Sequence, residues 1–252
     1  MYPISLEDCL EWIPAEETSI RVFSREDGQS LPKRLVDLEG KENLVLKAFE
    51  ILSAEFPLPK LNFYLLKNIP MGAGLGGGSS DAAFTLVYLN QVFKLGLGPD
   101  QIRQYATKLG SDCAFFVEPR PSLSKGRGEI LESFPLDLST YWIIIIKPRF
   151  SISTAEAYSR VFPGPPEYPL EMALKSPISS WKEMIYNDFE KSLFDPYPEL
   201  KSIKMDLYAK GAVYASLSGS GSALYGIFEK KPEMGLFEKC GQVFYLNPKE
   251  IH

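Results

Sequence analysis

The residues best suited to chemistry in this chain form one glycine-rich stretch between residues 70 and 83. Five of the residues 70–78 are glycine, Ser79 and Ser80 follow, and an apolar run occupies residues 82–93. Glycine lets the backbone adopt positive φ and bring its N–H groups close to a ligand, because no Cβ stands in the way. A serine N-cap, at Ser79 or Ser80, would open a helix whose first turn offers unpaired N–H donors and the positive end of a dipole. The stretch is therefore predicted to bind phosphate.

The segments on either side support this prediction. Leu61–Leu66 alternates and is rich in aromatics, which predicts a strand ahead of the loop. A P-loop is excluded because Gly78 stands where that motif has lysine. Gly72, Gly74 and Gly77 fit a dinucleotide-binding pattern, but residues 94–100 predict a loop where that fold needs a strand ending in an acid. A flexible linker is disfavoured, since linkers do not usually join a strand to a capped apolar helix.

The choice of a general base is narrow. The one histidine, His252, is the last residue, and terminal residues are usually poorly ordered. A Ser-His-Asp triad and a histidine metal centre are therefore not expected. Asp112 precedes the apolar run 113–117, where a buried carboxylate is costly unless it is paired or hydrogen-bonded. Two interpretations of Asp112 stay open with about equal weight, a helix or turn cap and a working residue.

Both kinds of secondary structure are expected around these residues. Period-two patterns predict strands and periods near 3.6 predict helices. The predicted strands are Cys9–Ile13, Ser19–Phe23, Leu61–Leu66, Ser122–Lys125, Glu129–Phe134, Tyr141–Lys147, Ala212–Leu217, Ala223–Phe228 and Gln242–Leu246. The predicted helices are Asn43–Phe56, capped by Asn43, Ala82–Phe93, Pro99–Leu109, one from Thr154, Ile178–Tyr186, Asp188–Phe194 and Pro198–Tyr208. A turn is predicted at Asp27–Gly28, and a domain boundary near residue 139 gives domains 1–139 and 140–252.

Composition limits the class of protein. The chain has 252 residues, 45% of them hydrophobic, with 27 Lys and Arg against 32 Asp and Glu and a net charge of −5. No dense basic run appears, so nucleic acid is not an expected partner. Cys9, Cys113 and Cys240 match neither a disulfide framework nor a zinc site, which favours a reducing compartment. No apolar run is long enough to span a bilayer and no signal peptide is recognised, so we expect a cytoplasmic protein without a membrane partner.

Three segments in order resemble motifs of the GHMP small-molecule kinases: the loop 70–83, Leu109–Asp112 and Leu217–Ser222. The Gly-Leu-Gly-Gly-Gly-Ser-Ser form and the following Gly-Ser-Asp are most similar to one branch of that family. The branch uses ATP to phosphorylate the 2-hydroxyl of a cytidine diphosphate-linked methylerythritol in the non-mevalonate isoprenoid pathway. The resemblance implies an α+β fold of two domains, an N-terminal one like domain 2 of ribosomal protein S5 and a ferredoxin-like C-terminal one. It also implies ATP and Mg²⁺ as cofactors.

The resemblance assigns roles to individual residues. Asp112 would be the catalytic general base, and the hydroxyl of Ser80 would help hold Mg²⁺. Ser218–Ser222 would support the phosphate loop, while Asn43 and Lys67 would lie near the nucleotide base. The residues that would bind the ATP phosphates are Pro70, Met71, Gly72, Ala73, Gly74, Leu75, Gly76, Gly77, Gly78, Ser79 and Ser80.

One departure from the family pattern concerns the N-terminus. Kinases of this group open with a strand carrying Ala-Lys-hydrophobic-Asn and an Asp-Gly-Tyr/Phe-His segment, whereas Met1–Ile4 resembles the residues just after both. The sequence as given is thus expected to lack a cation near Asp112 and to be a weak catalyst, as a monomer or a homodimer. Two alternatives remain: a GHMP kinase acting on mevalonate, homoserine or a sugar, and a non-catalytic nucleotide-binding protein.

Overall fold

The computed structural model describes residues 1–24 and 32–247, so the predicted Asp27–Gly28 turn and His252 lie outside the described residues. The chain divides into two compact units by its internal contacts. Unit 1 comprises Met1–Ile69 and Gly76–Pro135, and unit 2 comprises Pro70–Leu75 and the chain from Leu136 onward. The glycine stretch is therefore shared: its first half folds with unit 2 and its second half with unit 1. The family-domain boundary near residue 139 stays a prediction.

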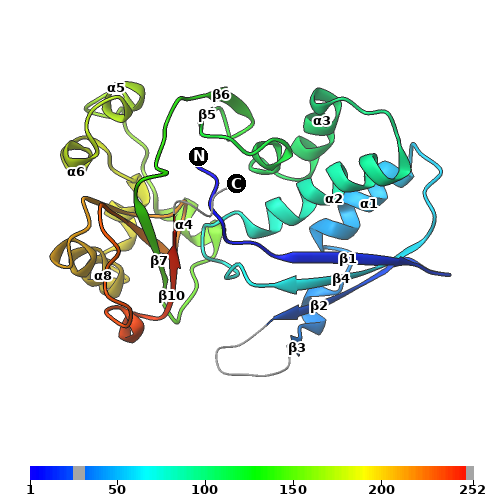
Figure 1. Cartoon of the computed structure of the whole chain (residues 1–252), viewed down its shortest axis with the longest axis horizontal. Coiled ribbons are helices and arrows are strands. Elements are labelled where there is room, and N and C mark those ends of the chain that lie inside the picture. The colour runs from blue at the N-terminus through cyan, green and yellow to red at the C-terminus, as the bar shows by residue number, and fades with distance from the viewer. Residues whose placement is uncertain (25–31, 248–252) are drawn as a thin grey trace. The chain divides into compact units, whose positions relative to one another are not determined.

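Unit 1 is built on a four-stranded sheet in the order β1-β4-β2-β3 (Figure 1). Strand β4 pairs antiparallel with β1 and parallel with β2. Every second residue of β4 is buried, which is the alternation from which the strand was predicted. The strands are β1 Cys9–Pro14, β2 Ser19–Ser24, β3 Lys33–Arg34 and β4 Leu61–Lys67.

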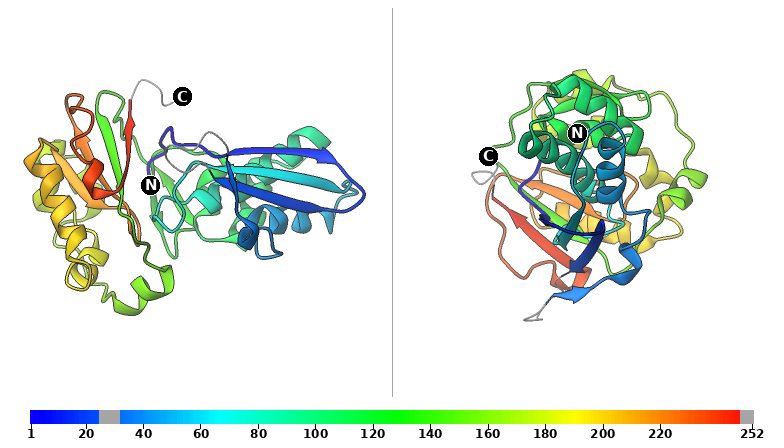
Figure 2. Two further views of the ribbon diagram at one scale, coloured as in Figure 1. Left: turned by 90° about the horizontal axis from the view of Figure 1, so that it is seen from below. Right: turned by 90° about the vertical axis from the view of Figure 1, so that its right-hand side faces the viewer.

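Helices cover one face of this sheet, as the left view of Figure 2 shows. They share one apolar core with the strands, in which Leu52, Phe63 and Leu86 are almost fully buried. Asn43 is the N-cap of the first helix, as predicted, and its side chain accepts a hydrogen bond from the Val45 N–H. The remaining elements of unit 1 are α1 Leu44–Ser53, α2 Gly77–Phe93, α3 Pro99–Leu109, the 3₁₀ helices η1 Val36–Leu38 and η2 Cys113–Val117, and the hairpin β5 Ser122–Lys125 and β6 Ile130–Ser133.

Unit 2 contains an antiparallel sheet in the order β10-β7-β9-β8. Numbered along the chain, this is the 4-1-3-2 order of the ferredoxin-like domain that was expected. The connection between the last two strands differs from that pattern, since it holds a short 3₁₀ helix, η4 Glu238–Cys240, where a second α-helix would stand. The strands are β7 Trp142–Lys147, β8 Tyr214–Leu217, β9 Leu224–Phe228 and β10 Gln242–Leu246.

The helices of unit 2 follow β7 in the chain. Leu193, Leu200, Ile203 and Leu207 belong to a second apolar core, which they share with residues of β7, β8 and β9. One of these helices, α5, was not predicted, because its five residues are too few to establish a period. The helices are α4 Thr154–Arg160, α5 Leu170–Leu174, η3 Ile178–Ser180, α6 Trp181–Met184, α7 Asp188–Leu193 and α8 Pro198–Ala209.

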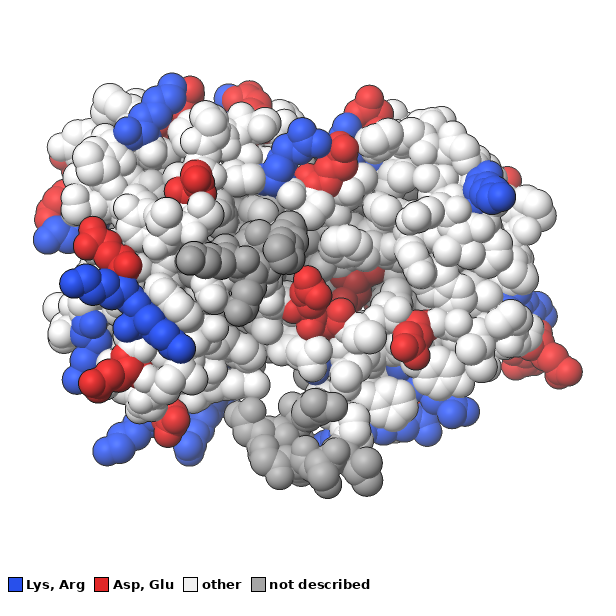
Figure 3. Space-filling view, viewed as in Figure 1, with Lys and Arg blue, Asp and Glu red and all other residues white. Residues whose placement is uncertain are grey.

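The surface agrees with the charge balance of the sequence. On the face drawn in Figure 3, lysine and arginine side chains lie among aspartate and glutamate side chains.

Within residues 1–24 and 32–247, no helix combines the length and the apolar character needed to cross a bilayer. Cys9, Cys113 and Cys240 are all free thiols.

Candidate active site

The glycine stretch makes three left-handed bends before it enters a helix. Gly72, Gly74 and Gly76 have φ of +59°, +72° and +71°, a region that other residues adopt only with strain. The helix α2 begins at Gly77 with Gly76 as N-cap, so the prediction of a serine N-cap was wrong. Because residues 76–78 carry no Cβ, the chain turns into the helix three to four residues earlier than a cap at Ser79 or Ser80 would give. The first turn of α2 therefore presents the backbone N–H groups of glycines.

The first half of the loop is held by the β8–β9 turn of the same unit. The Ser218 hydroxyl donates to the Gly74 carbonyl at 2.8 Å, and the Ala223 N–H donates to the Ala73 carbonyl at 3.0 Å. A Cβ on residue 74 would stand 2.0 Å from the Ser218 carbonyl oxygen, so only glycine fits there. The predicted support of the loop by residues 218–222 is confirmed.

The second half of the loop packs within unit 1. A Cβ on Gly76 would lie 2.9 Å from the ring of Phe116, which belongs to η2. A Cβ on Gly77 would lie 2.9 Å from Cγ2 of Ile69, the residue that precedes the loop. The start of α2 is thus pressed against both η2 and the end of the preceding chain, with no room for a side chain at either glycine.

Asp112 stands at the N-terminal end of η2. It occupies the N-cap position, but its side chain makes no capping hydrogen bond, so the cap interpretation does not account for the carboxylate. The side chain is half-buried, and a Cβ on Gly128, at the tip of the β5–β6 hairpin, would stand 3.2 Å from its Oδ1. Burial raises the pKa of Asp112, and a hydrogen bond from Ser111 opposes that rise.

The residue after Asp112 ties this aspartate to α2. Cys113 is fully buried, and its thiol hydrogen-bonds with the side chain of Ser79 in the first turn of α2. Burial raises the pKa of the Cys113 thiol. Contacts at Phe116 and Cys113 therefore fix η2 against the start of α2, and with it the backbone that carries Asp112. Two of the predicted elements, the loop's helical end and the aspartate, are brought together in one unit.

The remaining residues with predicted roles are Ser80, Asn43 and Lys67, and the structure shows the contacts of each. Ser80 lies in the first turn of α2, half-buried, with its N–H donating to the Gly76 carbonyl at 2.8 Å. Asn43 acts as a helix cap, and its amide donates to the Leu38 carbonyl at 2.8 Å. The Lys67 ammonium donates hydrogen bonds to the carboxylates of Asp8 and Asp81, so its positive charge is paired within the protein.

This cluster of Lys67, Asp8 and Asp81 was missed by the sequence analysis. All three side chains are less than 10% exposed. Burial raises the pKa of Asp81 to about 7, and the ammonium of Lys67 opposes that rise. A signal for the cluster exists in the sequence. Lys67 continues the buried positions Leu61, Phe63 and Leu65 of β4, and a lysine on the buried face of a strand requires a partner.

A second buried lysine belongs to unit 2. Lys147 ends β7, and its ammonium donates to the carbonyls of Pro148 and Phe150 at 2.9 and 2.7 Å and to the Ser151 hydroxyl at 3.2 Å. Burial lowers the pKa of Lys147. A Cβ on Gly72 would lie 3.4 Å from Cβ of Ser151, so Lys147 orders the segment on which the loop's first bend rests.

Metal ligands are sparse in the described chain. Among residues 1–24 and 32–247, no group of three or more histidine, cysteine, aspartate or glutamate side chains could hold a metal ion.

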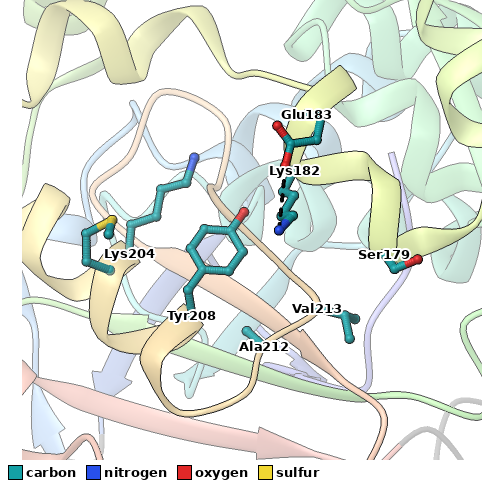
Figure 4. A pocket seen from close by; sticks show the side chains of 8 residues that line it. Ser179, Lys182, Glu183, Lys204, Tyr208, Ala212 and Val213 are labelled. Atoms are coloured by element: carbon teal, nitrogen blue, oxygen red, sulfur yellow. Dashed lines mark ion pairs between the residues drawn. The ribbon is translucent and has the colours of Figure 1, made fainter.

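A cavity of about 590 Å³ lies elsewhere, in unit 2 (Figure 4). Its walls come from η3, α6, α8 and the residues before β8, and include Lys182, Lys204 and Tyr208. The Lys204 ammonium is paired with the buried Glu190 at 2.6 Å, and Lys182 is paired with Glu183 at 3.5 Å. None of the glycine loop, Asp112 or the supporting turn contributes to its lining.

Similarity to known proteins assigns this arrangement to a family. The domain described as "GHMP kinases N terminal domain" matches residues 43–118, and "GHMP kinases C terminal" matches residues 171–239. A protein of Bacteroides thetaiotaomicron named 4-diphosphocytidyl-2-C-methyl-D-erythritol kinase is 47% identical over 231 residues, 90% of this chain and 81% of that protein. The chain belongs to the GHMP kinase family.

Solved structures agree with this assignment. This GHMP kinase is similar to a crystal structure of 4-(cytidine 5'-diphospho)-2C-methyl-D-erythritol kinase, with a TM-score of 0.76, 28% identity and coverage of 97% of this chain and 87% of that one. A homoserine kinase from Cytophaga hutchinsonii gives a TM-score of 0.66 at 17% identity, covering 95% of this chain and 85% of that one, which shows the fold alone. The expected two-domain fold and the small-molecule kinase class are confirmed.

Proposed function

We propose that this chain transfers the γ-phosphoryl group of ATP to the 2-hydroxyl of 4-diphosphocytidyl-2-C-methyl-D-erythritol. The observation that carries the proposal is the packing of η2, whose N-cap residue is Asp112, against the glycine-built first turn of α2. A base and a phosphate-binding helix end are the two parts that such a transfer needs. The choice of substrate follows the name of the relative that is 47% identical to the chain.

The glycine loop would bind the nucleotide phosphates through backbone N–H groups. The N–H groups of residues 77–79, at the start of α2, have no acceptor within the helix and lie at the positive end of the helix dipole. Donors fixed in this way stabilise charge that grows on the phosphate oxygens during transfer, since they need no reorganisation at that moment. Residues Pro70–Ser80 remain the proposed phosphate-binding set.

Asp112 would act as the general base. The substrate hydroxyl oxygen attacks the γ-phosphorus, the bond from that phosphorus to the β,γ-bridging oxygen breaks, and ADP leaves. The hydroxyl proton passes to the Asp112 carboxylate. Proximity of the base to the loop matters here as much as its pKa, because phosphoryl transfer depends mainly on positioning and charge stabilisation.

Mg²⁺ is proposed as the companion of ATP, with the Ser80 hydroxyl as its protein ligand. When bound, the ion would neutralise charge on the β- and γ-phosphates. The chain's own contribution is to hold the Ser80 hydroxyl in the first turn of α2, next to the amides that would face the same phosphates.

A cytoplasmic location is proposed from the three unpaired cysteines, because a reducing compartment keeps thiols free.

The proposal is tested by product formation from ATP with a panel of acceptors. The panel holds 4-diphosphocytidyl-2-C-methyl-D-erythritol, mevalonate, homoserine and galactose, and mass spectrometry detects the phosphorylated product after long incubation at high protein concentration. We expect a product from the first acceptor only. A product from another acceptor would reassign the substrate within the family, and nucleotide binding without any product would favour the non-catalytic alternative.

A further inference from the structure

The buried cluster of Asp8, Lys67 and Asp81 plays no part in the chemistry described above, yet it lies where the glycine loop begins and ends. Lys67 is the last residue of β4, two residues before the chain leaves unit 1 at Ile69. Asp81 is the fifth residue of α2, just after the chain has returned at Gly76. The Lys67 ammonium donates to Oδ2 of Asp81 at 2.6 Å, which joins the two ends directly.

Asp8 adds a third segment to this junction. Cys9 pairs with Leu66 in the antiparallel register of β1 and β4, so Asp8 lies opposite Lys67 (Figure 1). Oδ2 of Asp8 accepts a hydrogen bond from the Lys67 ammonium. Oδ1 accepts from the N–H groups of Asn68 and Ile69 at 2.6 and 2.8 Å. One carboxylate thus orients the last two peptide groups before the loop.

The first residue of α2, Gly77, packs against the ammonium of Lys67. A Cβ on Gly77 would stand 3.4 Å from Nζ of Lys67 as well as 2.9 Å from Ile69. The first residue of the helix is therefore packed against the last residue before the loop, over a buried ion pair. Side chains in such a site have little freedom, because any displacement leaves a buried charge without its partner.

We propose that the Asp8–Lys67–Asp81 cluster positions the phosphate-binding loop, fixing residues 69 and 77 so that the first-turn amides of α2 keep the direction that the phosphates of a nucleoside triphosphate require. The three residues are positioning residues, since they act through the loop and not on the ligand. The part of this inference that concerns the nucleotide rests on the proposed function. The part that concerns the loop does not.

The test compares hydrogen exchange at the amides of residues 68–80 in the free protein. Burial raises the pKa of Asp81 to about 7, so exchange is measured above that pH, where the carboxylate is ionised and Asp81→Asn removes its charge while keeping the shape of the side chain. Asp100→Asn is the matched substitution at an ion-paired aspartate of unit 1 whose side chain is 89% exposed. Leu52→Ala, in the core of unit 1, controls for a general loss of stability. We expect exchange in the loop to be about tenfold faster in Asp81→Asn than in either control, as for the loss of one charged hydrogen bond.

A second variant keeps the inference testable if Asp81→Asn folds poorly. Asp8→Asn, Lys67→Met and Asp81→Leu combined remove all three charges at once, so that no buried charge is left unpaired, and replacing buried ionic groups together by neutral side chains is often tolerated without loss of stability. Faster exchange confined to residues 68–80 in this stable variant would support positioning. Exchange in the loop equal to that of the controls, in both variants, would overturn it.

The part of the inference that concerns the nucleotide is tested by measuring nucleotide affinity. We expect calorimetry with Mg-ATP to give a dissociation constant about tenfold higher for Asp81→Asn than for Asp100→Asn. An unchanged constant alongside faster exchange would overturn the role in nucleotide binding and leave the role in loop order. If the unaltered chain binds no nucleotide, the proposed function fails, and the exchange measurement still decides whether the cluster orders the loop.

Discussion

Gly128 lies against Asp112, so closely that a Cβ on residue 128 would stand 3.2 Å from Oδ1 of the carboxylate. Gly128 also has φ of +122°, a conformation that L side chains rarely adopt. The β5–β6 hairpin therefore sets the position of the proposed base through a glycine, and nothing larger fits between them without moving the carboxylate.

Gly128→Ala is expected to lower the rate of phosphoryl transfer by about tenfold or more, because a small displacement of a base from its acceptor is costly in rate. Nucleotide affinity should change little. Gly211→Ala is the matched control, since Gly211 has φ of +99° and nothing within 4 Å of a built Cβ. The measurement is the initial rate of product formation, together with calorimetry. Equal rates in the two variants would show that contact with Asp112 is unimportant.

The rate of phosphoryl transfer should begin to fall, as pH is lowered, at a higher pH than it would with a base that has the ordinary pKa of aspartate. This low-pH part of the profile is the acid limb. The base works only when ionised, so the rate falls as pH falls through its folded pKa. Burial raises that pKa, and the hydrogen bond from Ser111 lowers it. Ser111→Ala should therefore move the limb to still higher pH, whereas Ser159→Ala, at an exposed serine of unit 2, should leave it in place. A limb that moves to lower pH in Ser111→Ala would contradict this account.

Gly74→Ala should disrupt the loop far more than its backbone angle alone requires. The substitution places a Cβ 2.0 Å from the Ser218 carbonyl oxygen at φ of +72°. Gly96→Ala shares the backbone cost of about 1–2 kcal/mol, with φ of +76°, but meets no atom within 4 Å. We expect Gly74→Ala to abolish measurable Mg-ATP binding and Gly96→Ala to preserve it. Binding retained in both variants would mean that the contact with residue 218 is dispensable.

Ser218→Ala probes the same contact more gently. It removes the 2.8 Å hydrogen bond to the Gly74 carbonyl, worth about 0.5–1.5 kcal/mol. Mg-ATP affinity should fall by a factor of about 2–10, which calorimetry can resolve. Ser53→Ala, at an exposed hydroxyl that also donates to a backbone carbonyl, is the control. A fall of the same size in both variants would remove the special role of the turn.

Much of the site was predictable because its signals are local. The strand–loop–helix order around residues 70–80 followed from alternation, glycines and an apolar run, and the structure confirms the order. The prediction of a serine N-cap for α2 was wrong, because the preference for serine at this position is only statistical. The N-cap position has a left-handed backbone and lies against Phe116, and glycine meets both requirements. Asp112 was identified from its place before an apolar run, and both strands of the β5–β6 hairpin were predicted, but the contact between Gly128 and Asp112 was not.

Contacts between residues distant in sequence could not be predicted from local sequence patterns. Asp8 lies 59 residues before Lys67, and only the register of β1 on β4 brings them together. The hydrogen bond from Ser218 to Gly74 spans 144 residues, and only the general support of the loop by residues 218–222 was inferred, from family resemblance and not from spacing. The division of the loop between two units has no signal in composition, because it follows from which elements pack on each half.

The most direct test of the central claim compares the unaltered chain with Asp112→Asn in the transfer of phosphate from Mg-ATP to 4-diphosphocytidyl-2-C-methyl-D-erythritol. Asparagine keeps the shape of the side chain and cannot accept the proton. Loss of a general base typically costs about 10²–10⁴-fold in rate, so we predict a loss of this size with Mg-ATP affinity unchanged. Equal product formation by the two proteins would contradict the role of Asp112.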